Sequence, residues 1–225
     1  MMNPVAQTAE ILSEAQELKF AFLKQTSADQ KRLNELEKQF GLVAARSFSG
    51  DHQKKAGWIN LYNALTCYWI SKYKLQGSML ASFPIYFLPR ITIDGLKFSL
   101  DDIEHGILRK NQRAPHKLWR QFRSSEIRNT LLIKEEDYRI HFALNCGALS
   151  CPPISAYNEK DIENQLFMAE QSFVSQEFHV NREKKIISAS AIFKMYKKDF
   201  KKNYVSDPAY RGFKVHYKKY DWTIG

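Results

Sequence analysis

The sequence predicts an α+β fold, a helix-rich single domain around a small sheet. Apolar residues recur at helical spacing over several long segments, whereas the segments that resemble strands are short and bounded by turn residues. The chain has 225 residues, of which 44% are hydrophobic and 13% aromatic, enough for one well-packed core. Helical and strand-like segments do not alternate regularly, which favours α+β over a parallel α/β sheet.

Three helices are expected in the first third of the chain. Residues 5–45 have apolar positions at helical spacing with a break at Thr26-Ser27, and we assign residues 1–45 to an N-terminal helical extension of a domain at 46–225. A strongly apolar helix follows around residues 58–70. Asn60 and Asn63 lie on one face of it, and their amides need partners there. Structural hydrogen bonds and a role in a site are equally consistent with this pattern.

A hairpin and a capped helix come next. Asp94-Gly95 between two short apolar runs predicts a hairpin at 91–98, and Ser99 with Asp102 is close to a capping box. In the helix that follows, His105 lies one turn from Asp101 and from Arg109, with Glu104 beside it. We favour a site over a surface charge ladder, because a carboxylate near a histidine can fix its tautomer.

The most informative stretch is residues 139–153, which hold an arginine, a histidine, an asparagine and two cysteines before Pro152-Pro153. We interpret its first half as a strand of the small sheet. A strand would place Arg139, His141 and Asn145 on one face and would direct His141 away from Cys146. Further helices are expected in part of 111–135, at 159–178 and at 191–200, with a second hairpin at 178–187.

The three cysteines do not form a disulfide framework or a zinc site. Cys67 falls in the apolar helix as a core thiol, and the Cys146/Cys151 pair has no second close pair of Cys or His to complete a zinc site. We therefore predict no metal and no cofactor. The first residues lack a signal-peptide pattern, and no run is apolar enough to span a bilayer, so we expect a cytoplasmic protein, or a secreted or periplasmic one whose signal was removed.

The net charge of +10 is concentrated at the C-terminal end. Residues 181–225 hold twelve Lys/Arg against four acidic residues. A solvated lysine-rich face is the simpler interpretation, and an anionic partner such as nucleic acid, acidic lipid or an acidic protein is the alternative.

Several blocks together resemble the family called domain of unknown function 547. They are Trp58-Ile59-Asn60-Leu61-Tyr62-Asn63-Ala64, residues 100–109, residues 139–148 with Ser150-Cys151-Pro152, residues 196–200 and Tyr220-Asp221-Trp222. The similarity covers roughly residues 45–225. It implies that Asn60, Asn63, Glu104, His105, Arg109, Arg139, His141, Asn145 and Cys146 converge in space, but it implies no activity.

Two functions are weighed equally. The first is a cysteine-dependent hydrolase or acyltransferase, distantly related to papain and transglutaminase folds. Its catalytic residues would be Cys146, His105, His141 and Glu104. The backbone N–H groups of the turn would donate to the oxyanion. The substrate or ligand would be bound by Asn60, Asn63, Arg109, Arg139 and Asn145. In a variant of this hypothesis Asn60 replaces the nucleophile and the enzyme is inactive.

The second function is a non-catalytic module that binds a small molecule or peptide and presents a basic C-terminal surface. Thiol redox chemistry through Cys146 and Cys151 is a third, minor hypothesis.

Overall fold

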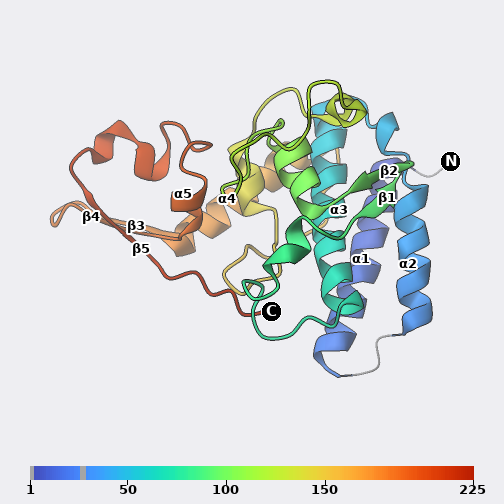
Figure 1. Ribbon diagram of the computed structural model, residues 1–225. Helices are drawn as coiled ribbons and strands as arrows, with labels where there is room; N and C mark the ends of the chain where they lie inside the picture. The colour runs from blue at the N-terminus through green and yellow to red at the C-terminus, as the bar shows by residue number, and fades with distance from the viewer. Residues whose placement is uncertain (1–2, 26–28) are drawn as a thin grey trace.

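The computed structural model describes residues 3–25 and 29–225 (Figure 1). The opening Met1-Met2 and the predicted break at Thr26-Ser27 lie outside the described residues. A layer of helices makes up one part of the molecule, and a small sheet with a short helix makes up the other (Figure 1). The predicted helix-rich α+β single domain is confirmed.

The helical layer consists of α1 (Pro4–Leu23), α2 (Gln30–Leu42) and α3 (Gly50–Lys72). Helix α3 lies at its centre, because every residue from Lys55 to Ser71 is buried. Helix α1 packs along α3 through apolar residues that include Ile11, Leu12 and Leu18. None of the helices in the described ranges is both long and apolar enough to cross a membrane.

The first hairpin and its capping box are confirmed. Strands β1 (Ile91–Ile93) and β2 (Leu96–Phe98) pair antiparallel around Asp94 and Gly95, whose φ angles are 50° and 75°. This is the backbone that a tight Asp-Gly hairpin turn requires. Ser99 and Asp102 exchange backbone-to-side-chain hydrogen bonds of 2.9 and 3.1 Å. The helix that follows widens into the π-helix η3 (Asp102–Leu108), a form often found at functional sites.

The predicted central strand is wrong, because Tyr138–Phe142 form a 3-10 helix, η5. The Asp137 carboxylate accepts the N–H of Arg139 at its start, and the N–H of Ala143 bonds to the carbonyl of Ile140 at 2.9 Å. These local bonds satisfy backbone groups that a sheet would otherwise use. His141 in this helix and Leu144 just beyond it both line the pocket described below.

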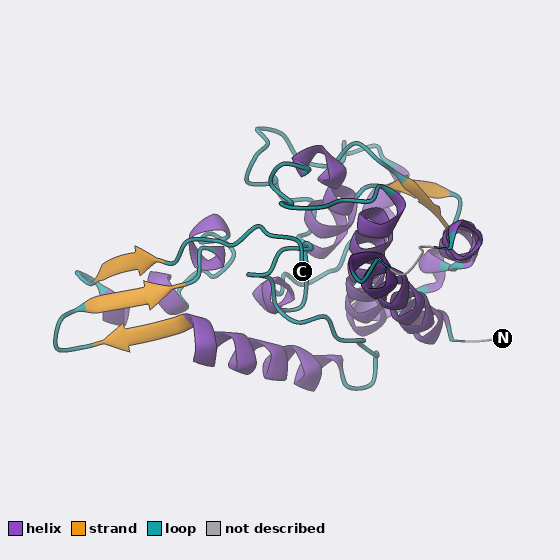
Figure 2. Ribbon diagram, turned by 90° about the horizontal axis from the view of Figure 1, so that it is seen from below, coloured by secondary structure: helices purple, strands orange, loops and turns teal. Residues whose placement is uncertain are grey.

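The sheet is built instead from later segments. Strand β3 (Phe178–Asn181) pairs antiparallel with β4 (Ile186–Ala189), which pairs parallel with β5 (Lys214–Tyr217). Helix α4 (Ile162–Glu177) leads directly into β3 (Figure 2). The second hairpin is confirmed, and β5 was not predicted. The predicted helix at 191–200 is shorter, α5 (Ile192–Met195), and within 111–135 the only helix in the described chain is a 3-10 turn, Ile127–Leu131.

Two hydrophobic cores result, one under the helical layer and one under the sheet. The remaining 3-10 turns are Ala45–Ser47, Phe83–Tyr86, Tyr204–Ser206 and Pro208–Tyr210.

Residues 220–224, which we call the C-terminal clamp, return from the sheet to the helical layer (Figure 1). Backbone N–H groups of Met79 and Leu149 donate to the carbonyls of Trp222 and Thr223, each at 2.8 Å, and Ile224 donates to Gly77. The clamp thereby fixes the loop that carries Cys146 and Cys151 beside the loop that follows α3.

Candidate active site

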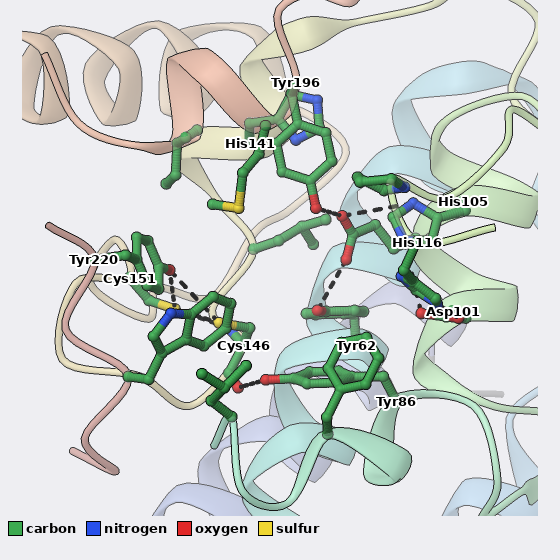
Figure 3. Close-up of a pocket in the computed structure, with 18 residues that line it drawn as sticks. Tyr62, Tyr86, Asp101, His105, His116, His141, Cys146, Cys151, Tyr196 and Tyr220 are labelled. Atoms are coloured by element: carbon green, nitrogen blue, oxygen red, sulfur yellow. Dashed lines mark hydrogen bonds and ion pairs between the residues drawn. The ribbon is translucent and has the colours of Figure 1, made fainter. Parts of the chain in front are cut away.

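A pocket of about 310 Å³ lies between the two cores (Figure 3). Its wall is built from α3, η3, η5, α5 with the residue after it, and the C-terminal clamp. The loop that carries Cys146 and Cys151, which we call the cysteine loop, completes it. The cysteines and Tyr220 lie on one side, and His105 and His116 lie on the opposite side (Figure 3). The polar and thiol side chains of the wall are Tyr62, Tyr86, Asp101, Glu104, His105, His116, His141, Cys146, Cys151, Tyr196 and Tyr220.

The two cysteines form a close pair of free thiols, both partly exposed. Their Sγ atoms are 2.8 Å apart, and the Tyr220 hydroxyl lies 3.1 Å from Cys151 Sγ and 3.6 Å from Cys146 Sγ. The backbone N–H of Cys146 also donates to Cys151 Sγ at 3.1 Å. Tyr86 holds the loop from the other side by donating to the carbonyl of Cys146 at 2.9 Å.

These contacts separate the acidities of the two thiols. The hydrogen bond from Cys151 is the main cause that lowers the pKa of Cys146 to about 7, with help from Tyr220 and against the effect of burial. Burial and the neighbouring Cys146 raise the pKa of Cys151 above the ordinary thiol range. Burial also raises the pKa of Cys67, to about 11. Cys146 is therefore the thiol most readily ionised at neutral pH.

Glu104 lies in the wall as a hydrogen-bonded carboxylate. It accepts from the Tyr62 hydroxyl at 3.0 Å and from the Tyr196 hydroxyl at 2.6 Å. Burial opposes its ionisation, but the hydrogen bond from the Tyr196 hydroxyl and the charge of Arg109 favour it, so the pKa of Glu104 is lowered. At neutral pH this group is an acceptor and a base rather than an acid.

His105 is held neutral. Burial lowers its pKa to about 4, although Glu104 and Asp101 act in the opposite direction. Arg109 Nη1 lies 3.0 Å from His105 Nδ1. Because a guanidinium can only donate, Nδ1 accepts and the proton lies on Nε2, which is 3.6 Å from Asp101 Oδ1.

His141 is oriented by Asp199, which lies just beyond α5. The carboxylate is 2.8 Å from His141 Nε2 and also accepts two hydrogen bonds from Arg109, at 2.7 and 2.9 Å. Burial would raise the pKa of Asp199, but its bonds with His141 and Arg109 lower it strongly. The His141 imidazole stacks on the Tyr196 ring with centroids 3.9 Å apart. Asp199 therefore orients His141 directly, and the stacked imidazole in turn positions Tyr196, which donates to Glu104.

Asp101, His105 and His116 form a group whose potential ligand atoms all lie within 4.8 Å of one another. These residue types could hold a divalent cation. In the arrangement present, however, Asp101 already accepts from His116 at 3.0 Å and from Lys117 at 2.7 Å, and His105 Nε2 carries a proton toward it. The hydrogen bonds and the lysine charge satisfy the carboxylate without an ion.

The structure places four predicted residues in the pocket wall: Glu104, His105, His141 and Cys146. The argument from strand alternation that directed His141 away from Cys146 does not apply, because the segment is a 3-10 helix, and both residues line one pocket. Among the described residues, no histidine nitrogen is hydrogen-bonded to Cys146, whose partners are Cys151 and Tyr220.

The three predicted asparagines support the backbone beside the pocket. Asn60 bonds to both the carbonyl and the N–H of Tyr157. Asn63 donates to the carbonyl of Ala143 and accepts from the N–H of Asn145. The side chain of Asn145 spans the cysteine loop, from Pro152 to Gly147. None of the three is among the described residues that line the pocket.

The two arginines lie elsewhere. Arg109 lies behind the pocket, bonded to His105 and Asp199, and lines a neighbouring basic cavity. Arg139 bonds to Asp137 and Glu163 and is not part of the described pocket wall. The expected convergence of all nine residues is therefore only partly right.

Sequence reasoning missed the hydroxyl groups of the site and Asp199. Tyr196 and Asp199 are three residues apart, a spacing that resembles one helical turn, and this was the available signal. No local pattern connects Tyr220 with cysteines that precede it by 74 and 69 residues.

The fold and the pocket define a helix-rich α+β protein with an ionisable thiol, a carboxylate and histidines around one cavity. The chain belongs to the family of proteins of unknown function DUF547, whose family model matches residues 45–174. The match includes α3, η3, η5 and both cysteines of the pair, and it ends within α4. No curated protein and no solved structure matches the chain.

Proposed function

We propose that the protein is a cysteine-dependent acyl-transfer enzyme, a hydrolase or acyltransferase with Cys146 as nucleophile. One observation carries the proposal: the thiol with the lowered pKa opens into a pocket whose wall also holds Glu104, His105 and His141. A thiolate, not a thiol, is the attacking species, and the lowered pKa of Cys146 increases the fraction of thiolate at neutral pH.

In the first step the Cys146 thiolate attacks the carbonyl carbon of the substrate and forms a thioester, and the leaving group departs with its bonding electrons as an alkoxide or thiolate, which takes a proton from water. The expectation that the turn supplies backbone donors to the oxyanion is wrong for two groups. The N–H of Cys146 bonds to Cys151 Sγ, and the N–H of Gly147 bonds to Asn145 at 2.8 Å. The Tyr220 hydroxyl, which contacts the thiolate before attack, is the donor placed to follow the charge onto the oxygen.

In the second step Glu104 serves as the base. Its carboxylate takes a proton from water or from an acceptor alcohol or amine, which then attacks the thioester and releases Cys146. Glu104 is ionised and His105 is neutral at pH 7, so neither readily protonates a poor leaving group. We therefore expect esters and thioesters rather than amides as substrates.

The test is acylation by p-nitrophenyl acetate, followed by release of p-nitrophenolate and by mass spectrometry of the intact protein. We expect one acetyl group on Cys146, a rate that rises with pH to half its maximum near pH 7, and loss of this reaction in Cys146→Ala. Cys67→Ala is the matched control, because that thiol is buried and its pKa is raised. An acylation rate in Cys146→Ala equal to that of the native chain would refute the proposal.

The alternative is a non-catalytic module whose pocket holds a small ligand. The hydrogen bonds that Glu104 accepts from Tyr62 and Tyr196 favour this function, because a fully paired buried network can stabilise a fold without taking part in a reaction. In the same experiment this function predicts that Cys146 is acetylated once and is never regenerated. Continued turnover beyond one equivalent distinguishes the enzyme from the module.

We further propose that an anionic group of the substrate is bound beside the pocket. A cavity of about 610 Å³ shares Pro115, Met195 and Tyr196 with the pocket that Cys146 and Cys151 line. Seven cationic side chains line it with one carboxylate, Asp199; the cations are Arg109, Arg113, Lys117, Lys194, Lys197, Lys198 and Lys201. Within the described chain, no carboxylate lies within ion-pair distance of Arg113, Lys194, Lys197 or Lys198.

Inorganic tripolyphosphate is a suitable probe of this cavity by calorimetry. We expect binding that weakens with salt and falls at least tenfold in Lys197→Glu/Lys198→Glu. Lys184→Glu/Lys185→Glu makes the same change of charge in the turn between β3 and β4, outside the cavity, and serves as the control. Equal losses in the two double variants would show non-specific attraction and would refute the site.

A further inference from the structure

We propose that Cys146 and Cys151 form a thiol–disulfide exchange site that takes small aliphatic disulfides, with Cys146 as the attacking thiol and Cys151 as the resolving thiol.

The geometry of the pair is the first support. The Sγ atoms are 2.8 Å apart, so a move of less than about 1 Å brings them to the roughly 2.05 Å of a disulfide. Gly147, with φ of 93°, begins the turn that brings the two residues together, and the N–H of Cys151 donates to the carbonyl of Ala148 at 3.0 Å. The loop is already folded around the position that the bond would occupy, so little ordering is required.

The surroundings of the two sulfurs differ in a way that assigns their roles. Cys151 Sγ accepts the backbone N–H of Cys146 and lies beside the Tyr220 hydroxyl, each at 3.1 Å, whereas Cys146 Sγ lies 3.6 Å from that hydroxyl and 2.8 Å from Cys151 Sγ. With the N–H and the hydroxyl directed at the lone pairs of Cys151 Sγ, its S–H is left to face Cys146 Sγ, so we assign Cys151 as the donor that keeps its proton until Cys146 has reacted. Lowered pKa at Cys146 and raised pKa at Cys151 agree with this assignment.

Access is the third support. Both thiols line the pocket of about 310 Å³, whose wall is mostly aromatic and aliphatic, and both are partly exposed. Cys67, in contrast, is fully buried within α3. A small uncharged disulfide can therefore reach the pair and not the third thiol.

The exchange balances without any further oxidant. The Cys146 thiolate attacks one sulfur of the small disulfide, forming a mixed disulfide and releasing one thiolate, which takes a proton from water. Cys151 then loses its proton to solvent and attacks Cys146 Sγ, and the second small thiolate leaves and is protonated. The protein pair is oxidised to a disulfide, and the small disulfide is reduced to two thiols.

The consequence for catalysis rests on the proposed function, because a disulfide at Cys146 removes the nucleophile of acyl transfer. The exchange itself needs no acyl substrate and is measured separately.

The experiment treats the reduced full chain with 2-hydroxyethyl disulfide at pH 7, quenches it with acid and follows intact mass and digested peptides. In the native chain we expect a short-lived hydroxyethylthio adduct on Cys146 and then a disulfide that joins Cys146 to Cys151. In Cys151→Ser the adduct should persist, with a decay at least about tenfold slower. Cys67→Ser is the control and should behave like the native chain.

Two results would overturn the inference. One is an adduct on Cys146 that persists equally in the native chain and in Cys151→Ser. The other is adduct formation on Cys67 at the same rate as on Cys146. If Cys151→Ser does not fold, the joined peptide and the short life of the adduct in the native chain still decide the matter. Acyl transfer could fail in its own assay while exchange proceeds, so the two proposals are refuted by different measurements.

Discussion

Replacement of Asp137 tests whether the ion pairs behind the pocket stabilise the segment that carries His141. The Asp137 side chain is only 8% exposed, and its carboxylate lies 2.7 Å from the ammonium of Lys55, itself 7% exposed. It also accepts hydrogen bonds from the side chain and the backbone N–H of Arg139, in the first turn of η5. We predict that Asp137→Asn, which keeps the shape of the cap and removes the charge, destabilises the protein at pH 7.

The magnitude follows from the acidity of Asp137. Burial would raise its pKa, but hydrogen bonds from Arg139 and Lys55 outweigh burial and lower the pKa from 3.8 to about 2. Since one pKa unit corresponds to about 1.4 kcal/mol, the ionised form gains about 2 kcal/mol from folding. Because the folded-state pKa is lowered, this stability is present above about pH 4 and is lost as pH falls through about 2, with about half left at pH 3.

Urea unfolding of the native chain and of Asp137→Asn at pH 7, 5 and 3 measures the difference. We expect Asp137→Asn to lower the free energy of unfolding by about 2 kcal/mol at pH 7 and 5 and by about half of that at pH 3. Glu163→Gln is the matched control, since Glu163 pairs with the same Lys55 and Arg139 but is 48% exposed, and its loss should cost less than about 1 kcal/mol. A difference below about 0.5 kcal/mol at pH 7, or one that does not decline toward pH 3, would refute this reasoning.

Three further predictions concern the pocket and its supports. Gly106→Ala should cost about 1–3 kcal/mol in urea unfolding, because an added Cβ would lie 2.3 Å from the ring of Phe122; an unchanged midpoint would contradict this. Asn63→Ala should cost about 2 kcal/mol by the same assay, because it leaves the buried carbonyl of Ala143 and the part-buried N–H of Asn145 without this partner, and a cost near zero would show that water replaces the amide. Tyr220→Phe should raise the pKa of Cys146 toward the ordinary thiol value of about 8.5 and slow its alkylation by iodoacetamide at pH 7 several-fold, whereas an unshifted pH profile would exclude the hydroxyl as a donor to the thiolate.

The parts of the fold that could be predicted are those that depend on near neighbours in the chain. The Asp94-Gly95 turn and the Ser99–Asp102 cap each require only a few residues in a fixed local geometry, and both are confirmed. The apolar run in α3 likewise predicts a helix buried along most of its length. Local chemistry was sufficient for these elements.

The central strand was mispredicted because alternating residue types do not exclude a short 3-10 helix. The choice between the two conformations depends on Asp137, whose carboxylate caps the helix and is held by Lys55 of α3, which also pairs with Glu163 of α4. Tertiary contacts of this kind override local preference and leave no periodic signal in the sequence.

The site, like the fold, could be predicted only where its residues are near neighbours in the chain. Glu104, His105 and Cys146 stood out by residue type and spacing, and the structure brings them to one pocket. Asp199 and Tyr220 come from segments far along the chain, and only the return of the C-terminal clamp brings Tyr220 to the sulfurs.

The position of Tyr220 in the chain also determines when, during synthesis, the pocket can be completed. Cys146 leaves the ribosome 74 residues before the tyrosine that contacts its sulfur. At a translation rate of roughly 5–20 residues per second, Cys146 is present for about 4–15 s before the Tyr220 hydroxyl and the backbone bonds of residues 222–224 can form. Throughout that interval the nascent chain has both cysteines but lacks the contribution of Tyr220 to the lowered pKa of Cys146 and the bonds that fix the cysteine loop, so the site is complete only after translation has passed the C-terminal clamp.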